Sequence, residues 1–278
     1  RIFVNIRNQL IQNRFRSFGI SLLLLVSQVS QADQILPPPD FDLSQPAISI
    51  IIDDMGYRLQ SGNRAINLPG AVTYSFLPYS PHVKALSKLA HDKNKEVMLH
   101  LPMESENNNK LGPGGLTECM TEKKFINVLE SSIKSIPYIK GFNNHMGSLL
   151  TKSNIWMTRL MQEIAVDNRL YFVDSKTTKD SVALKIAREE GIQSIQRDIF
   201  IDHEETDVFI RQQLKKLIRK AKREGTALAI AHPKKETLAI LENWIPLLHS
   251  QGIRLVPVSS LIQMQQQKKY ALWKKNIQ

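Results

Sequence analysis

The sequence predicts an α/β fold in which a mostly parallel sheet of about seven to eight strands is closed, or nearly closed, into a barrel. Segments with strand character alternate with helical patterns along most of the chain. Acidic residues and histidines recur where these strands end, as they do around the active sites of α/β barrels. The length of 278 residues and the 42% hydrophobic content suit one large globular domain or two small ones.

The first 32 residues have the composition of a secretory signal peptide. Arginines precede the apolar stretch 18–26, and Ser30 and Ala32 place small residues before a candidate cleavage site. The apolar stretch is too short for a comfortable membrane span. We therefore expect an exported protein that is cleaved near Ala32, and an uncleaved membrane anchor is the alternative.

Behind the signal peptide (residues 1–32), a proline-rich tether over residues 33–46 is expected to lead into a domain that covers residues 47–270. A basic tail over residues 271–278 completes the chain in this interpretation. The single cysteine, Cys119, excludes an intrachain disulfide. A domain of this size can be stable on its hydrophobic core without one.

The chain carries a formal net charge of +11, and much of the basic excess lies in residues 211–225 and 268–275. A solvated helix face is one interpretation of these segments. Attraction to an anionic envelope polymer or membrane surface is the other. We do not expect nucleic acid as a partner, because an exported chain with no recognisable reading motif does not fit that role.

The predicted strands are short, apolar and rich in β-branched residues. They cover residues 47–52, 71–76, 95–99, 139–142, 169–173, 192–195, 226–230 and 253–257. The first of them, AISIII, is an unbroken apolar run, which is typical of a buried strand. It ends abruptly in two aspartates, and this abrupt change marks the first candidate for a functional position.

Helical patterns fill most of the gaps between the strands. They cover residues 82–93, 121–135, 153–167, 180–190, 206–223, 234–250 and 259–270. Ser80 followed by proline and Thr121 followed by glutamate are typical helix starts. Gly191, Gly225 and Gly252 each follow a helical pattern, as C-terminal caps do. This alternation of strands and helices indicates a parallel sheet.

Nearly every predicted strand ends close to an acid or a histidine. These residues are Asp53, Asp54, His100, Glu104, His145, Asp174, Asp202, His203 and His232. A lone histidine is more often a structural residue than a functional one. The joint pattern is different, because the carboxyl ends of parallel strands meet on one face of an α/β barrel. The sequence therefore predicts a functional cluster on that face.

Metal-assisted hydrolysis is the chemistry that best suits such a cluster. Asp53 and Asp54 could simply form a strand-to-loop turn, but together they could also supply a general base and a metal ligand. Two imidazoles and a carboxylate make a three-ligand site with an open position for water, whose pKa zinc lowers to about 7. Asp54, His100 and His145 could be the ligands, Asp53 the base, and His232 the acid that protonates a leaving amine.

Five segments, in this order, resemble the divergent polysaccharide deacetylase family of exported bacterial proteins: IIDDMGY, EVMLHLPME, NHMGS, FVDSKT and AIAHP. The resemblance spans roughly residues 46–262. That family is related to a larger group of metal-dependent deacetylases that act on N-acetylated sugars and have a distorted (β/α) barrel. The resemblance therefore implies a distorted, incomplete barrel and a polysaccharide substrate. It also implies a periplasmic location, with anchoring in the inner membrane as the alternative.

In the larger group, an aspartate pair supplies first the base and then a metal ligand, and Asp53 and Asp54 match this pair. Its second motif places two histidines on the metal. His100 matches the first of these positions, whereas Glu104 stands at the second. The third ligand is therefore expected to be His145, with Glu104 as the second choice.

The late motif of the larger group, which contains a catalytic histidine, is similar to the segment that ends at His232. Asp174 in FVDSKT is a further candidate site residue. The Arg-x-Pro-Tyr segment of the larger group has no clear counterpart in this sequence. Two functions stay open: a metal-dependent deacetylase of envelope or matrix polysaccharide, with zinc as the expected metal, and a non-catalytic module on the same fold that binds envelope sugars or docks a partner.

Overall fold

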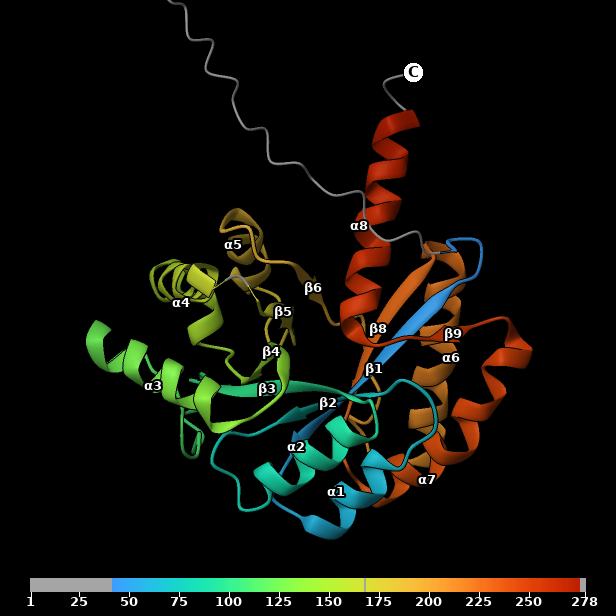
Figure 1. The fold of residues 1–278 in the computed structure, drawn as a ribbon, viewed down its shortest axis with the longest axis horizontal. Coiled ribbons are helices and arrows are strands. Elements are labelled where there is room, and N and C mark those ends of the chain that lie inside the picture. Colours follow the sequence, from blue (N-terminus) through green and yellow to red (C-terminus); the bar gives the residue numbers. More distant parts are fainter. Residues whose placement is uncertain (1–41, 168, 276–278) are drawn as a thin grey trace, which may run out of the picture. The chain divides into compact units, whose positions relative to one another are not determined.

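A computed structural model of the protein describes residues 42–167 and 169–275, and its fold is shown in Figure 1. The signal peptide expected over residues 1–32 lies outside the described residues, as does most of the tether expected over residues 33–46. Within the described ranges, no helix is both long and apolar enough to cross a membrane.

In the described part of the chain, all strands belong to one sheet whose neighbouring pairs are parallel. The strands are β1 (Ala47–Met55), β2 (Thr73–Phe76), β3 (Glu96–Met103), β4 (Ile139–Met146), β5 (Tyr171–Asp174), β6 (Ser194–Gln196), β7 (Ile199–Phe200), β8 (Thr226–Ala231) and β9 (Arg254–Leu255). Their order is β6-β5-β4-β3-β2-β1-β8-β7, and β9 pairs with the start of β1. The predicted strands are confirmed. Strand β7 was not predicted, because its two residues give too little pattern.

The two end strands of this order, β6 and β7, are consecutive in the chain and are separated by Arg197 and Asp198 alone. Three Cα–Cα steps span at most about 11 Å, so the sheet must curl until its edges come close together. No hydrogen-bonded ladder joins β6 to β7 among the described residues. The fold is therefore an α/β distorted barrel with a seam between β6 and β7, which confirms the predicted fold class.

Helices connect most consecutive strands (Figure 1). They are α1 (Leu59–Ile66), α2 (Val83–Asp92), α3 (Glu122–Ser135), α4 (Asn154–Asp167), α5 (Ala183–Glu189), α6 (Asp207–Glu224), α7 (Lys235–Trp244) and α8 (Val258–Lys275), with short 3-10 turns at Leu150–Lys152, Ile245–Leu247 and His249–Gln251. The predicted helical segments are confirmed, and the boundary expected at residue 270 between domain and tail falls inside α8.

Two helical regions differ from the prediction for identifiable reasons. Helix α1 was not predicted, because Gly62 and its polar neighbours lower the helix propensity. A Cβ atom at Gly62 would lie 2.5 Å from Leu86 Cδ1, so glycine allows α1 to pack closely on α2. The segment predicted as one helix over residues 234–250 breaks into α7 and two 3-10 turns, because Pro246 has no N–H to continue the helical ladder.

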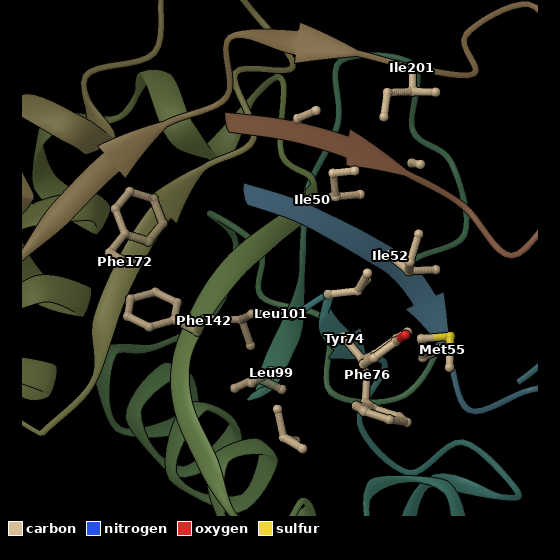
Figure 2. Close-up of a cluster of buried hydrophobic side chains, with 14 of the residues drawn as sticks. Ile50, Ile52, Met55, Tyr74, Phe76, Leu99, Leu101, Phe142, Phe172 and Ile201 are labelled. Atoms are coloured by element: carbon tan, nitrogen blue, oxygen red, sulfur yellow. The ribbon is translucent and has the colours of Figure 1, made fainter. Parts of the chain in front are cut away.

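Alternate residues of the strands pack on the outer face of the sheet against the helices, as the strand period of two requires. Figure 2 shows part of this core, to which β1 contributes Ile50 and Ile52, β3 contributes Leu99 and Leu101, β4 contributes Phe142, and β5 contributes Phe172. All of these side chains are fully buried. Burial of each one stabilises the fold by about 1.5–3 kcal/mol, so this core fixes the strands that carry the polar cluster.

The opposite, inner face of the sheet is divided between α8 and polar side chains. Apolar residues of the strands pack there against the first turns of α8, namely Ala47, Ile51, Met98, Tyr171, Val173, Leu228 and Ile230 against Val258, Leu261, Ile262 and Met264. Figure 1 shows α8 starting beside β8 and β1, both of which it contacts, and then extending away from the sheet. Helix α8 therefore fills the part of the barrel interior near the amino ends of the strands and leaves the carboxyl ends to the polar side chains.

Glu96, at the start of β3, ties α8 to the sheet. Its Oε1 accepts hydrogen bonds from Tyr171 Oη at 2.8 Å, Thr73 Oγ1 at 3.2 Å and the backbone N–H of Ser259 at 3.2 Å. Tyr171 reaches Glu96 from β5 by crossing β4 at Gly141, where a Cβ atom would lie 2.4 Å from the tyrosine ring. The absence of a side chain at this position allows the contact.

We expect the substitution Gly141→Ala to destabilise the protein by about 1–3 kcal/mol, because the new methyl group overpacks against the buried ring of Tyr171. Urea unfolding of the two proteins measures the difference. The matched control is the same substitution in a Tyr171→Ala background, where the ring is gone and the added cost should nearly vanish. An equal cost in both backgrounds would contradict this account of the crossing.

Candidate metal centre

A β-bulge explains why two aspartates stand side by side at the end of β1. In a regular strand, neighbouring side chains point to opposite faces of the sheet. The register of β1 against β2 shifts between Ile52 and Met55, so that two residues of β1 face one residue of β2. Asp54 also has a left-handed backbone, with φ of 56°. As a result, carboxylate oxygens of Asp53 and Asp54 lie 3.7 and 3.3 Å from the same atom, His100 Nε2.

Asp54, His100 and His145 form a compact cluster of possible metal ligands. Asp54 Oδ1 lies 3.3 Å from His100 Nε2 and 3.1 Å from His145 Nδ1, and the two ring nitrogens are 3.1 Å apart. In a tetrahedral zinc site with bonds of about 2.0–2.1 Å, neighbouring ligand atoms are about 3.3 Å apart. The three predicted ligands are therefore brought together at the spacing that one zinc-sized cation requires.

The hydrogen bonds around the cluster leave atoms of Asp54 and His100 available to bind a cation. Asp54 Oδ1 is buried and makes no hydrogen bond of acceptable geometry, although buried carboxylate oxygens normally have a partner. The Nδ1 of His100 lies 2.8 Å from the amide oxygen of Asn143, which also accepts a hydrogen bond from Ser75 Oγ at 2.6 Å. This oxygen can only accept, so Nδ1 of His100 carries a proton, and Nε2 is the atom that would offer its lone pair to a cation when the ring is neutral.

Asn143 links the metal cluster to the second aspartate. Its amide nitrogen donates to both carboxylate oxygens of Asp53, at 2.9 and 3.1 Å, while its oxygen orients His100. Asp53 is almost completely buried and is not part of the ligand group. Asn143 was not predicted as a site residue. The only indication in the sequence was its place two residues before His145, which puts the two side chains on the same face of β4.

Burial and charge act in opposite directions on the pKa values of Asp53, Asp54 and His100. Burial raises the pKa of Asp53 above its usual range, against the attraction of His100 and His232. For Asp54, burial is outweighed by His100 and His145, which hold its pKa well below the usual range. Burial opposes protonation of His100, but Asp53 and Asp54 prevail and raise its pKa to about 8. The site thus attracts positive charge.

His232 approaches the cluster from the end of β8. Its Nδ1 donates to Asp202 Oδ1 at 2.9 Å, and its backbone N–H donates to Asp202 Oδ2 at 2.8 Å. Thr237 Oγ1 also donates to Asp202 Oδ2, at 3.0 Å. His232 Nε2 then lies 3.9 Å from Asp54 Oδ2. Burial lowers the pKa of His232, but the bond to Asp202 outweighs it, so that the pKa is raised overall.

The sequence analysis noted Asp202 at a strand end but assigned it no role. The structure shows that this fully buried carboxylate orients His232. His203, next to it, is exposed, and its ring lies 5.8 Å from the ring of Phe200. Asp202 could have been assigned only by knowing that β7 and β8 are neighbours, which the two-residue length of β7 concealed.

The two additional candidates, Glu104 and Asp174, lie outside the ligand group of the described residues. Glu104 Oε2 accepts the backbone N–H of Glu118 at 2.7 Å and so closes the loop that follows β3. Asp174 accepts hydrogen bonds from the backbone N–H of Lys176 and from Ser181 Oγ, both at 2.8 Å. In this structure His145, and not Glu104, therefore lies with Asp54 and His100 in the group that could hold a metal ion.

A cleft of about 870 Å³ opens beside the cluster. Asp54, His145 and His232 line one part of it, and the start of α1 and the β8–α7 loop line the rest. Tyr57 also lines the cleft and is 47% exposed, so its ring is accessible to a ligand. The size is within the range of about 300–1,000 Å³ for small-molecule sites.

A distorted α/β barrel with an Asp-His-His cluster at its carboxyl edge defines the class of protein: a barrel of the polysaccharide deacetylase type with a candidate metal site. The chain belongs to the divergent polysaccharide deacetylase family, whose sequence profile matches residues 50–262. This match confirms the family resemblance that the five sequence segments carry.

Two relatives and one solved structure are similar to the chain. The uncharacterized protein YibQ of Escherichia coli K12 is 34% identical over 224 residues, which is 79% of this chain and 70% of that protein. An uncharacterized protein of Haemophilus influenzae is 32% identical over 221 residues, 80% of this chain and 78% of its own length. The crystal structure of an uncharacterized protein from Agrobacterium tumefaciens C58 has a TM-score of 0.76 and 24% identity, and covers 81% of this chain and 92% of that one. It supports the fold.

We expect the substitution Asn143→Ala to weaken zinc binding by about 10- to 100-fold, because it removes the group that fixes the His100 ring and its tautomer. Calorimetric titration of the metal-free protein with zinc measures the affinity. Asn127→Ala, on the exposed face of α3, is the matched control and should bind zinc like the wild type. Unchanged affinity in Asn143→Ala would contradict the positioning role.

Proposed function

We propose that the protein is a zinc-dependent hydrolase that removes acetyl groups from an N-acetylated polysaccharide of the cell envelope or matrix. The observation that carries this proposal is the separation of roles within one site. Three side chains form a ligand group, while Asp53 and His232 lie beside it without belonging to it. Amide hydrolysis needs such a division, because one group must take a proton from water and another must give a proton to the leaving nitrogen.

Asp54, His100 and His145 would hold the metal. A zinc ion bound there supplies Lewis acidity, which polarises the acyl oxygen and lowers the pKa of water to about 7. Asp53 is the group that accepts the proton of the attacking water. Its carboxylate is held by the Asn143 amide, and its raised pKa makes it a better proton acceptor than an ordinary aspartate.

His232 is the group that protonates the leaving nitrogen. Asp202 accepts the Nδ1 proton, which fixes the ring and leaves Nε2 on the side of the cluster. The raised pKa favours a protonated imidazole near neutral pH. Asp53 thus takes one proton and His232 returns one, so that the reaction releases acetate and a free amine with the protons balanced.

The proposed polymer is supported by the family, and the proposed location by the sequence. Membership of the divergent polysaccharide deacetylase family supports a polysaccharide substrate. The signal-peptide composition of residues 1–32 supports export, and the proposed location is the periplasm after cleavage near Ala32, with an inner-membrane anchor as the alternative. The open cleft lined by Tyr57 supports a bulky extended ligand.

A non-catalytic envelope sugar-binding or docking module on the same fold is the second candidate. It is favoured by one feature of the sequence, the lack of a clear counterpart to the Arg-x-Pro-Tyr segment of the larger deacetylase group. Asp53 favours the enzyme, because a site that only binds sugars does not require a buried carboxylate outside the ligand group.

Substitutions of the two aspartates should have different effects. Asp54→Ala should lose both zinc and acetate release, because the two remaining histidines rarely hold zinc tightly in water. Asp53→Asn should keep the metal and the fold, while acetate release from N-acetylated glycans falls by about 10²–10⁴-fold, the usual contribution of a positioned general base. Metal content and turnover are measured on both variants and on the wild type.

Asp180→Asn removes the same charge at an exposed position and serves as the control. Equal loss of metal from both aspartate variants would show that the pair binds jointly and would refute the assignment of roles. Full activity in Asp53→Asn would refute the general base. A zinc-loaded wild type that releases no acetate from any N-acetylated glycan would favour the binding module.

A further inference from the structure

A second concave region lies at the seam between β6 and β7, apart from the cleft described above. It consists of two adjoining hollows of about 480 and 390 Å³ that share Lys176, Lys179 and Gln196. We call this region the seam hollow. Each part is within the size range of about 300–1,000 Å³ for small-molecule sites.

The lining of the seam hollow is strongly basic. It carries six cationic side chains, Lys176, Lys179, Lys185, Arg188, Arg197 and Lys220, and three acidic ones, Asp174, Glu189 and Asp198. Like charges gathered around a concave surface repel each other and create a positive potential that attracts anions.

The acids of the lining are already engaged. Glu189 pairs with Lys185 at 3.6 Å. Asp198 pairs with Lys220 at 3.4 Å and accepts the backbone N–H of Leu228. The carboxylate of Asp174 accepts its two hydrogen bonds from a backbone N–H and from a serine hydroxyl. None of the three acids forms an ion pair with the other cations of the lining.

Four cations of the seam hollow therefore lack a carboxylate within ion-pair distance among the described residues. They are Lys176, Lys179, Arg188 and Arg197. The lysines come from the loop after β5, Arg188 comes from α5, and Arg197 comes from the β6–β7 junction. Because three separate elements supply them, the charge is arranged around the hollow rather than along one solvated helix face.

Arg197 is held rigidly in this arrangement. Its Nε and one terminal nitrogen donate to the backbone oxygens of Ser175 and Lys176, at 2.7 and 2.9 Å, and its guanidinium lies 5.1 Å from the centre of the Phe200 ring. The guanidinium has five N–H donors, so these two bonds leave others for a ligand. Burial lowers the pKa of Arg197, as expected for a partly buried cation without an ion-pair partner.

The seam hollow borders the candidate catalytic cluster through two contacts. Ser175, whose carbonyl holds Arg197, accepts a hydrogen bond from the Asn143 amide at 3.2 Å through its side chain. The ring of Phe200, which packs on Arg197, lies 5.4 Å from the ring of His232. The seam hollow and the cluster are therefore neighbouring regions separated by a wall to which Ser175, Asn143, Phe200 and His232 contribute.

We propose that the seam hollow binds a carboxylate or phosphate group of an anionic glycan whose neighbouring N-acetylated unit occupies the catalytic cluster. The identity of the polymer rests on the proposed function, whereas the binding of an anion rests on the unpaired cations alone. Arg197 provides a planar donor for carboxylate or phosphate, and the lysines provide point charges suited to either.

The test uses the full chain and three probes: a hyaluronan hexasaccharide, which carries N-acetyl groups and carboxylates, a phosphorylated N-acetylglucosamine oligosaccharide, and neutral chitohexaose. Calorimetry at low salt gives each affinity. The variant Lys179→Gln/Arg188→Gln removes two exposed, unpaired charges, and Lys215→Gln/Lys216→Gln on exposed positions of α6 removes the same charge elsewhere.

We expect at least one anionic probe to bind about tenfold more tightly than chitohexaose and to lose about tenfold in the seam variant, since two partly exposed ion pairs together contribute about that much. The α6 variant should bind like the wild type. Equal affinity for charged and neutral probes, or an undiminished affinity in the seam variant, would overturn the proposal. The charged probe that responds identifies the source of the anion.

Failure of the proposed function gives a different result. If the wild type releases no acetate but an anionic probe still binds through Lys179 and Arg188, the hydrolase is refuted and the anion site stands. If acetate is released from all N-acetylated probes at the same rate and the seam variant is unaffected, the hydrolase stands and the anion site is refuted.

Discussion

The bulge at the end of β1 is the constraint on which the candidate site depends. Without it, Asp53 and Asp54 would point to opposite faces of the sheet, and only one of them could reach the barrel interior. The left-handed backbone of Asp54 costs of order 1–3 kcal/mol. The burial of the apolar run that precedes it offsets this strain, because the outer-face side chains of β1 are fully buried against the helices.

Helix α8 and the buried hydrogen bonds of Asn143 and Asp202 support this arrangement. Helix α8, tied to the sheet by Glu96, packs its first turns on apolar side chains of the inner face, away from the polar cluster at the carboxyl ends. Asn143 connects Asp53 to His100, and Asp202 holds His232. The candidate base, one candidate ligand and the candidate acid are therefore oriented by buried hydrogen bonds from Asn143 in β4 and from Asp202 after β7.

Much of this could be predicted from the sequence. The alternation of strands and helices gave the barrel, and the rule that strand carboxyl ends meet on one face brought Asp54, His100 and His145 together. The sequence could not decide between His145 and Glu104, because both follow strands at that face. The structure separates the two residues, because Glu104 accepts the backbone N–H of Glu118 in the loop after β3 while His145 lies beside Asp54 and His100.

Other features depend on contacts between distant parts of the chain and leave no local pattern. The role of Asp202 and the seam between β6 and β7 both depend on the position of β7. This strand has only two residues, too few to show the alternation typical of a strand. The contact of Tyr171 with Glu96 depends on Gly141, which looks like any other glycine in the sequence but leaves room for the tyrosine ring. Such features become visible only when the strand order is known.

We expect Asp54, His100 and His145 to hold one metal ion that Asp53 does not bind. X-ray absorption spectroscopy and anomalous diffraction of the zinc-loaded protein test this arrangement most directly. One zinc should be bonded to His100 Nε2, His145 Nδ1 and a carboxylate oxygen of Asp54, with bonds of about 2.0–2.2 Å. A zinc ion bonded to Asp53 instead, or held at Glu104 with the cluster empty, would contradict it.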